Sequence, residues 1–148
     1  MTADEVVTAA VAWAAEICAI SSTYTFMTGE KSKVLPDVMG DLNERRFALE
    51  DATNFPGLQL QQVALEIFNL NLSFLVDNSD QAQAAATLRG YSDALGVGVR
   101  NDATLHGRVQ VASPFVTFDF ARPFVEYEDG TVGRELTMQM LVAELVEV

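Results

Sequence analysis

Residues 66 to 76 read EIFNLNLSFLV, a stretch in which apolar and polar side chains alternate. The apolar side chains share one face of an extended chain and the polar ones the other: Phe68, Leu70, Leu72, Phe74 and Val76 against Asn69, Asn71 and Ser73. Strict period two predicts a β-strand with one buried face. At about 3.3 Å per residue the stretch spans roughly 36 Å, about twice the length of a common strand. We therefore expect a sheet of long strands.

The last third of the chain predicts a long β-hairpin. Residues 128 to 131 (EDGT) contain the Asp-Gly pair that a two-residue type I′ turn favours. Extending the pairing of Glu128 with Thr131 places three apolar pairs on one face: Val116 with Ala143, Phe118 with Leu141, and Pro114 with Leu145. The opposite face mixes apolar and polar residues, so we expect it to be half buried. Pro114 and Pro123 mark positions where pairing is interrupted or a bulge forms.

A first amphipathic helix is expected over residues 3 to about 19. Thr2 followed by Glu5 has the spacing of a capping box, and Asp4 and Glu5 lie favourably at the positive end of the helix dipole. Apolar residues then recur at helical spacing, which predicts one buried face. Trp13 lies on that face as an anchor of either the core or an interface.

A second helix is expected over about residues 79 to 95. Asn78 and Gln81 form another capping-box pair, and apolar residues follow with a period of 3.6. We expect Gly96 and Gly98 to end this helix. Because Gly-Val-Gly follows a helix rather than a strand, it does not indicate a nucleotide-binding loop.

Shorter elements complete the predicted fold. Residues 24–27 and 38–47 are expected to form strands, residues 29–33 a turn, and residues 50–62 a loop. The order is then a helix, two or three strands, a long strand, a helix and a long hairpin. This order predicts a single domain, residues 1–148, of the α+β class: a mainly antiparallel sheet of long strands with two helices packed on one face.

The composition argues against several classes of function. Acidic residues outnumber basic ones by 21 to 9, and a net charge of −12 argues against binding DNA or an anionic membrane by electrostatics. Hydrophobic content of 49% excludes a disordered acidic chain, and no apolar run approaches the roughly 18 residues of a spanning helix. The acidic N-terminus lacks the positive charge of a secretory signal, so we expect no export by that route.

Few residues suggest catalysis or metal binding. His106 is the only histidine, and we expect it to be a solvated loop residue, since one histidine and the distant Cys18 do not form a usual zinc site. Cys18 is expected to be a small apolar residue on the first helix. Carboxylates crowd between residues 37 and 51, where they either hold Mg²⁺ or pair with the adjacent Arg45 and Arg46; their spacing matches no loop motif for Ca²⁺ or Mg²⁺. We therefore predict no catalytic residue, no cofactor and no metal site.

Aromatic residues near the predicted hairpin tip form the one candidate site. Phe124, Val125 and Tyr127 lie close to Arg122, and Phe, Tyr and Arg are enriched in protein interfaces. These residues form a partner interface, or they join the core if the hairpin folds back and buries them.

Five short segments, taken in their order and spacing, carry a resemblance to a known family: 35–38 (LPDV), 72–77 (LSFLVD), 87–90 (TLRG), 112–114 (ASP) and 123–131 (PFVEYEDGT). With them, the chain from about residue 24 onward resembles the tail terminators of bacteriophages with long, non-contractile tails (the siphovirus type), particularly those of actinobacterial hosts. None of the segments is a catalytic signature.

The resemblance implies a structural virion protein rather than an enzyme. Such a subunit forms a homohexameric ring on the completed tail tube, stops tube polymerisation and provides the surface for head–tail joining. The implied partners are further copies of itself, the tail-tube protein and the head–tail connector, with DNA passing through the ring without specific binding. The implied location is the head-proximal end of the virion tail, after assembly in the host cytoplasm. Alternatives are another neck or tail subunit (a connector or stopper), a small metal-dependent α+β enzyme, or a stand-alone interaction module.

Overall fold

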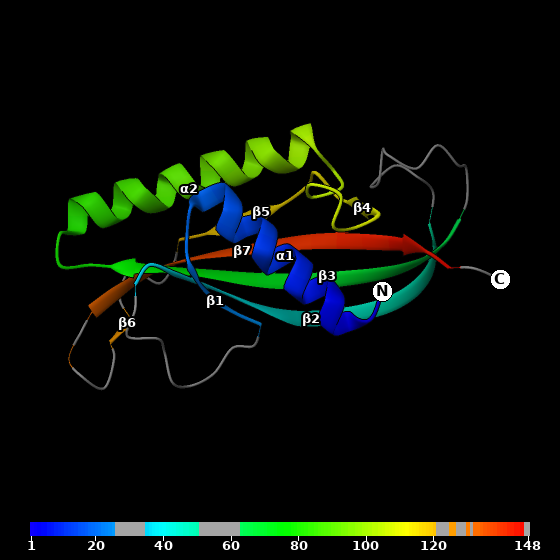
Figure 1. Ribbon diagram of the computed structural model, residues 1–148, viewed down its shortest axis with the longest axis horizontal. Coiled ribbons are helices and arrows are strands. Elements are labelled where there is room, and N and C mark those ends of the chain that lie inside the picture. Colours follow the sequence, from blue (N-terminus) through cyan, green and yellow to red (C-terminus); the bar gives the residue numbers. More distant parts are fainter. Residues whose placement is uncertain (26–34, 51–62, 121–124, 127–129, 131, 147–148) are drawn as a thin grey trace.

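Both helices lie on the same side of one mixed sheet (Figure 1). The computed structural model describes residues 1–25, 35–50, 63–120, 125–126, 130 and 132–146. Its elements in chain order are α1 (Ala3–Cys18), β1 (Ser22–Tyr24), β2 (Asp37–Glu50), β3 (Val63–Asp77), α2 (Gln81–Asn101), β4 (Val111–Ala112), β5 (Thr117–Asp119), β6 (Val125–Glu126) and β7 (Val132–Leu145). The predicted α+β class is confirmed.

The long strands occupy the centre of the sheet, whose order is β1-β2-β3-β7-β4. β3 pairs antiparallel with β2 on one side and with β7 on the other, along most of its length. On the outer side of β7 the short strands β4, β5 and β6 each pair with it, also antiparallel. Of the described strands only β1 is parallel to its neighbour, β2. The sheet is therefore mainly antiparallel, as predicted.

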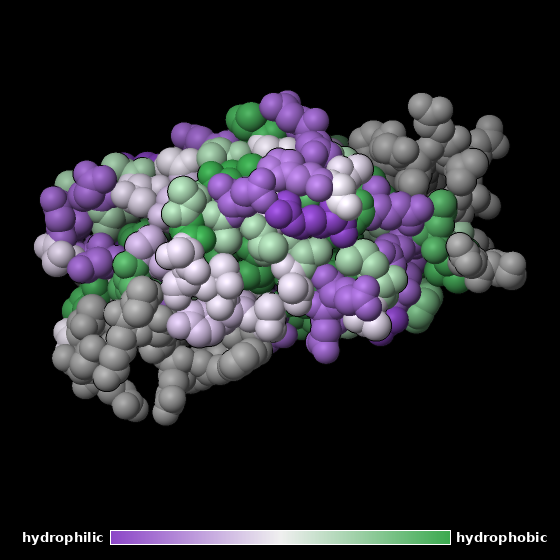
Figure 2. All heavy atoms as spheres, in the orientation of Figure 1, coloured by the Kyte–Doolittle hydropathy of each residue, from purple (hydrophilic) through white to green (hydrophobic). Residues whose placement is uncertain are grey.

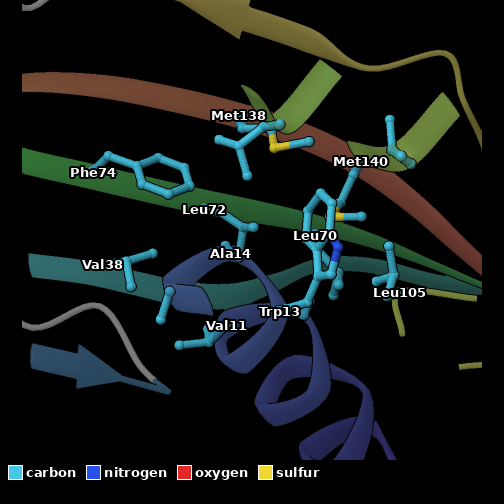
Figure 3. Close-up of a cluster of buried hydrophobic side chains, with 14 of the residues drawn as sticks. Val11, Trp13, Ala14, Val38, Leu70, Leu72, Phe74, Leu105, Met138 and Met140 are labelled. Carbon is cyan, nitrogen blue, oxygen red and sulfur yellow. The ribbon is translucent and has the colours of Figure 1, made fainter. Parts of the chain in front are cut away.

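β3 is the predicted strand and is 15 residues long. The even-numbered residues from Phe68 to Phe74 are fully buried on the side of the helices. Met138 and Met140 of β7 lie beside them, and Trp13 of α1 covers this layer (Figure 3). Burial of each such side chain stabilises the fold by about 1.5–3 kcal/mol. This layer is the main hydrophobic core.

α1 begins at the predicted cap and packs closely on the sheet. The Thr2 hydroxyl accepts a hydrogen bond from the Glu5 amide at 3.2 Å, which is the N-cap bond, and donates one to the Glu5 carboxylate at 3.2 Å. Trp13 is fully buried and is a core anchor. A Cβ built on Gly40 of β2 would lie only 2.4 Å from Cγ2 of Val11. The absence of a side chain at Gly40 therefore allows α1 to approach β2.

α2 continues to Asn101, so the prediction that Gly96 and Gly98 end this helix is wrong. Gly98 faces α1 instead: a Cβ there would lie 3.2 Å from Cζ2 of Trp13 and 3.4 Å from Cδ1 of Ile17. A glycine inside a helix costs about 1 kcal/mol relative to alanine. Close contact between the two helices offsets that cost, because a larger residue at position 98 would crowd Trp13 and Ile17.

The start of α2 also differs from the prediction. Asp80, rather than Asn78, is the cap, and its side chain accepts a hydrogen bond from the Gln83 amide at 3.1 Å. Neither helix in the described part of the chain is long and apolar enough to cross a membrane.

The predicted register of the C-terminal hairpin is wrong. Phe118 pairs with Met138 rather than with Leu141, and Ala143 pairs with Val111. Three short strands, rather than one long strand, lie along β7, and the register differs between them. A shift by an odd number of residues exchanges the two faces of a strand. Phe118 therefore shares the helix-covered face with Met138, where it is partly buried against the main core, whereas its predicted partner Leu141 lies on the other face.

The N-terminal strands have different bounds from those predicted. β1 ends at Tyr24 rather than beginning there, and β2 runs from residue 37 to 50 rather than from 38 to 47. β2 contains a bulge between Leu42 and Glu44, and its pairing with β3 resumes beyond it. The predicted turn at 29–33 and nearly all of the predicted loop at 50–62 lie outside the described residues.

The sheet face opposite the helices has apolar ends and a polar middle. Two buried clusters occupy its ends: Leu65, Ile67, Val111 and Ala143 in one, and Met39 with Leu75 in the other. Between them, one row of cross-strand neighbours is polar throughout: Asp41, Asn71, Gln139 and Thr117. This face is therefore only partly buried.

Candidate interaction surfaces

Of the four residues predicted to form an interface, only Val125 lies in the described part of the chain. It belongs to β6, where it pairs with Gly133 near the beginning of β7. Arg122, Phe124 and Tyr127 lie outside the described residues, so their role stays a prediction. β6 itself lies beside β7 on the outer edge of the sheet.

The side of the molecule that carries the helices shows hydrophilic and hydrophobic residues intermixed (Figure 2). No broad hydrophobic patch covers the described residues visible in that view. Large exposed apolar patches mark many protein interaction sites. The strongest candidates therefore lie at the two edges of the sheet, where single aromatic side chains are exposed.

At one edge, a groove of about 590 Å³ runs between α2 and residues 114–119, which comprise β5 and the residues just before it and are called the β5 segment. Its lining includes Gly96, Val97 and Arg100 from α2 and Phe115, Val116 and Phe118 from the β5 segment. Val97 is 47% exposed and Phe115 is 68% exposed. Asp93 places a carboxylate in the same groove as the Arg100 guanidinium. Apolar walls with a few charged groups are typical of surfaces that bind another protein.

At the opposite edge, Phe47 of β2 is 67% exposed. The guanidinium carbon of Arg45 lies 5.8 Å from the centre of the Phe47 ring and 5.3 Å from that of Phe68. Arg45 also forms an ion pair with Glu66 on β3. A cation at this distance is attracted to the ring face. Phe47 is therefore exposed yet held in a defined position.

Among the strands that the structure describes, both edges of the sheet are open over much of their length. Among the described strands, β1 pairs with only the first three residues of β2, so residues 40–50 have no strand partner on that side. On the other edge, β5 pairs with β7 alone. Open edges can pair with another chain, and charged residues and bulges limit nonspecific pairing. β2 has both features, with its bulge followed by Glu44, Arg45 and Arg46.

Charged side chains of α1 and of the loop after α2 form a surface cluster. Glu16 accepts a hydrogen bond from Nη2 of Arg108 at 2.5 Å and lies 3.0 Å from Nδ1 of His106. The hydrogen bond from Arg108 is the largest cause of a lowered pKa at Glu16. Hydrogen bonds from Thr104, and then one from the His106 amide, lower the pKa of Asp102. The cluster fastens the loop to α1.

His106 lies in a turn with a positive φ of 61°, which confirms the predicted loop position. It is exposed but has charged neighbours rather than water alone, because Glu16 and Arg108 both reach its ring. The described part of the chain holds no group of three or more His, Cys, Asp or Glu side chains that could bind a metal ion.

The carboxylates between residues 37 and 51 do not converge in the part of that segment that the structure describes. Glu44 lies 3.6 Å from Arg46, whereas Arg45 pairs with Glu66 on the neighbouring strand. Asp37 is fully buried. Charge pairing is thus the arrangement found for Glu44.

Cys18 is the last residue of α1 and packs partly buried against the main core. Burial raises the pKa of its thiol to about 12. Since the thiolate is the reactive form of cysteine, Cys18 is a poor nucleophile at neutral pH. It has the apolar role that the sequence predicts.

The sequence pattern does not single out Phe47, Val97 or Phe115 as surface residues. The bulge in β2 changes which residues face the helices, and no sequence signal marks that bulge. For Phe115 one signal exists, since the preceding Pro114 interrupts strand pairing and favours an edge position. For Val97, the sequence predicts that the helix ends near residue 95, so it does not predict that Val97 lies on a helix.

The fold alone defines the class: an α+β protein with two helices on one face of a mainly antiparallel sheet. No protein-family model matches the sequence, and no curated protein matches it. Among solved structures, a chain from "Virion of native gene transfer agent (GTA) particle" is similar over 96% of this chain and 92% of its own length, with 18% identity and a TM-score of 0.36. At this TM-score the likeness carries no inference about function.

Proposed function

We propose that the chain is a structural virion subunit, and more specifically a tail terminator of a phage-type particle with a long, non-contractile tail. It assembles with further copies of itself into a ring on the end of the tail tube and stops the tube from growing. The opposite surface of the ring then receives the head–tail connector. The order and spacing of the five sequence segments between residues 35 and 131 support this proposal.

The observation that supports it most is that the described strands form a sheet with two unlike edges, both open over much of their length. A ring of identical subunits needs two different, complementary surfaces on each copy, because each contact joins one surface to the other. The β2 edge presents Phe47, whereas the β5 edge presents a groove next to α2. They are the two opposite edges of one sheet, so copies can add at both.

The charge of the chain suits a ring around DNA. At −12 per copy, a ring lumen lined by this protein repels phosphate, so DNA slides through without sticking. The polar middle of the sheet face opposite the helices is one surface that can line such a lumen. An assembled ring with a neutral or basic lumen would contradict this part of the proposal.

The test measures particle mass over a wide range of protein concentration, together with negative-stain imaging of tail tubes made from the tube protein of the same genome. We expect ring-shaped particles, or density at one end of each tube, and shorter tubes when the chain is present during polymerisation. A protein that stays monomeric at high concentration and leaves tube ends bare would refute the terminator function.

Two alternatives give different results in the same set of experiments. A connector or stopper forms oligomers but does not bind bare tube ends. A metal-dependent enzyme shows a specific site of about micromolar affinity in calorimetry with Mg²⁺, Mn²⁺ or Ca²⁺.

A further inference from the structure

We propose that Phe47 of one copy inserts into the groove between α2 and the β5 segment of the next copy, so that successive sheets meet edge to edge. This inference rests on the proposed function only in taking the chain to self-assemble. It names the two surfaces in contact and the side chain that anchors them.

The two surfaces lie on the same side of the sheet. Phe47 pairs with Glu66, and the Arg45 that holds its ring also contacts Phe68 on the helix-covered face. On the other edge, Phe118 pairs with Met138 of the main core, and the groove opens between this strand segment and α2. α2 lies on this same helix-covered side of the sheet (Figure 1). When the β2 edge of one copy meets the β5 edge of another, Phe47 therefore extends toward the α2 of its neighbour.

The chemistry of the two surfaces is complementary. The ring of Phe47 meets apolar groups in the groove, among them Val97 and Phe118. Arg100 can lie against the ring face, as Arg45 already does within one copy. Asp93 places a carboxylate where it can receive the guanidinium of Arg45. An aromatic side chain with a neighbouring guanidinium thus faces a groove that has both apolar walls and a carboxylate.

Phe47 also has the properties of an anchor residue. It is 67% exposed in the single copy, so most of its ring is available for burial in a contact. Arg45 and its ion pair with Glu66 already fix the ring, which lowers the conformational cost of binding. Aromatic and Arg side chains in buried pockets carry a large share of the free energy of most interfaces.

The test uses two single variants, Phe47→Asp and Val97→Asp, each of which places a charge on one of the two surfaces. Both side chains are substantially exposed, so both variants are expected to fold, with a melting temperature close to that of the parent protein. Ala86→Asp is the matched control, because Ala86 is exposed on α2 outside the groove. Self-association is measured by sedimentation and native mass spectrometry, in solution and at tail-tube ends.

Each surface variant alone is expected to raise the concentration for half-assembly by roughly 30-fold or more, the effect of losing one buried anchor. The Ala86 variant is expected to assemble like the parent. An equimolar mixture of the two surface variants is decisive. The Phe47 variant keeps an intact groove and the Val97 variant keeps an intact Phe47, so the mixture should form one-to-one dimers that do not extend.

The outcomes separate this inference from the proposed function. Unchanged assembly of both variants, or a mixture that forms no dimer, overturns the contact proposed here while leaving a tail terminator possible. Assembly that depends on both residues but never occurs on tube ends supports the contact and refutes the terminator function. A parent protein that is monomeric in solution and at tube ends refutes both.

Discussion

Replacing Gly40 with alanine should destabilise the protein, although the same change usually strengthens a strand. Gly40 lies in β2 beneath α1, and an added Cβ would lie 2.4 Å from Cγ2 of Val11 and 2.9 Å from Cδ2 of Leu72. Carbon atoms prefer a separation of about 3.5–4.0 Å, so both contacts are far too short. Either α1 moves away from the sheet or the two side chains leave their rotamers.

The magnitude follows from two opposing terms. Overpacking a close-packed core costs about 1–3 kcal/mol. Alanine recovers about 0.5–1 kcal/mol, because glycine loses more backbone freedom than alanine on folding. At the middle of both ranges the net loss is about 1 kcal/mol, which for a chain of this size lowers the melting temperature by roughly 2–4 °C.

The assay is urea unfolding and thermal melting followed by circular dichroism, with Gly90→Ala as the matched control. A Cβ on Gly90 meets no atom within 4 Å, so that variant should gain about 0.5–1 kcal/mol from helix propensity. The double variant Gly40→Ala with Val11→Ala should lose less stability than the two single losses added together. If Gly40→Ala is as stable as the parent, the close approach of α1 to β2 is wrong.

Three further predictions follow from the charged and reactive groups. The pKa of Glu16 is lower in the folded protein than its ordinary value of 4.5, so its pairing with Arg108 stabilises the fold above pH 4.5 and this stabilisation is lost as the pH falls through the folded-state pKa. Glu16→Gln should therefore lower the melting temperature at neutral pH but not near pH 2, and an equal effect at both would contradict the pairing. With its pKa raised to about 12 from 9.0, native Cys18 should react with a thiol reagent at pH 8 roughly a thousandfold more slowly than in the unfolded chain, and comparable rates would show that it is not buried. Since each copy carries a charge of −12, added salt should strengthen self-association in sedimentation experiments, whereas weakening by salt would indicate that attractive ion pairs dominate the contact.

Local patterns predicted the central elements because there one signal dominates. β3 and the capped start of α1 follow directly from alternation and from the Thr2–Glu5 spacing. Gly98 shows where such reasoning fails: a glycine near a helix end has the same appearance whether it stops the helix or makes room for Trp13. Only the position of the other helix distinguishes these cases.

The candidate site was less predictable than the fold. The predicted hairpin register assumed that pairing continues without interruption from the turn. The structure instead has separate short strands along β7, and one of them places Phe118 opposite Met138. The exposure of Phe47 depends on the bulge in β2, and that of Phe115 on its position just before the start of β5. Both depend on how the whole sheet is arranged. The aromatic residues that the sequence did favour, Phe124 and Tyr127, both lie outside the described part of the chain.

The division of the outer edge of β7 into three short strands has a mechanical consequence. β4, β5 and β6 are each held by two or three residue pairs, whereas β3 is held along nearly its full length. Segments with few pairs open at a small fraction of the global unfolding free energy. We therefore expect the β5 segment to open at a lower free energy than β3, so that this wall of the groove adjusts most readily to whatever enters it.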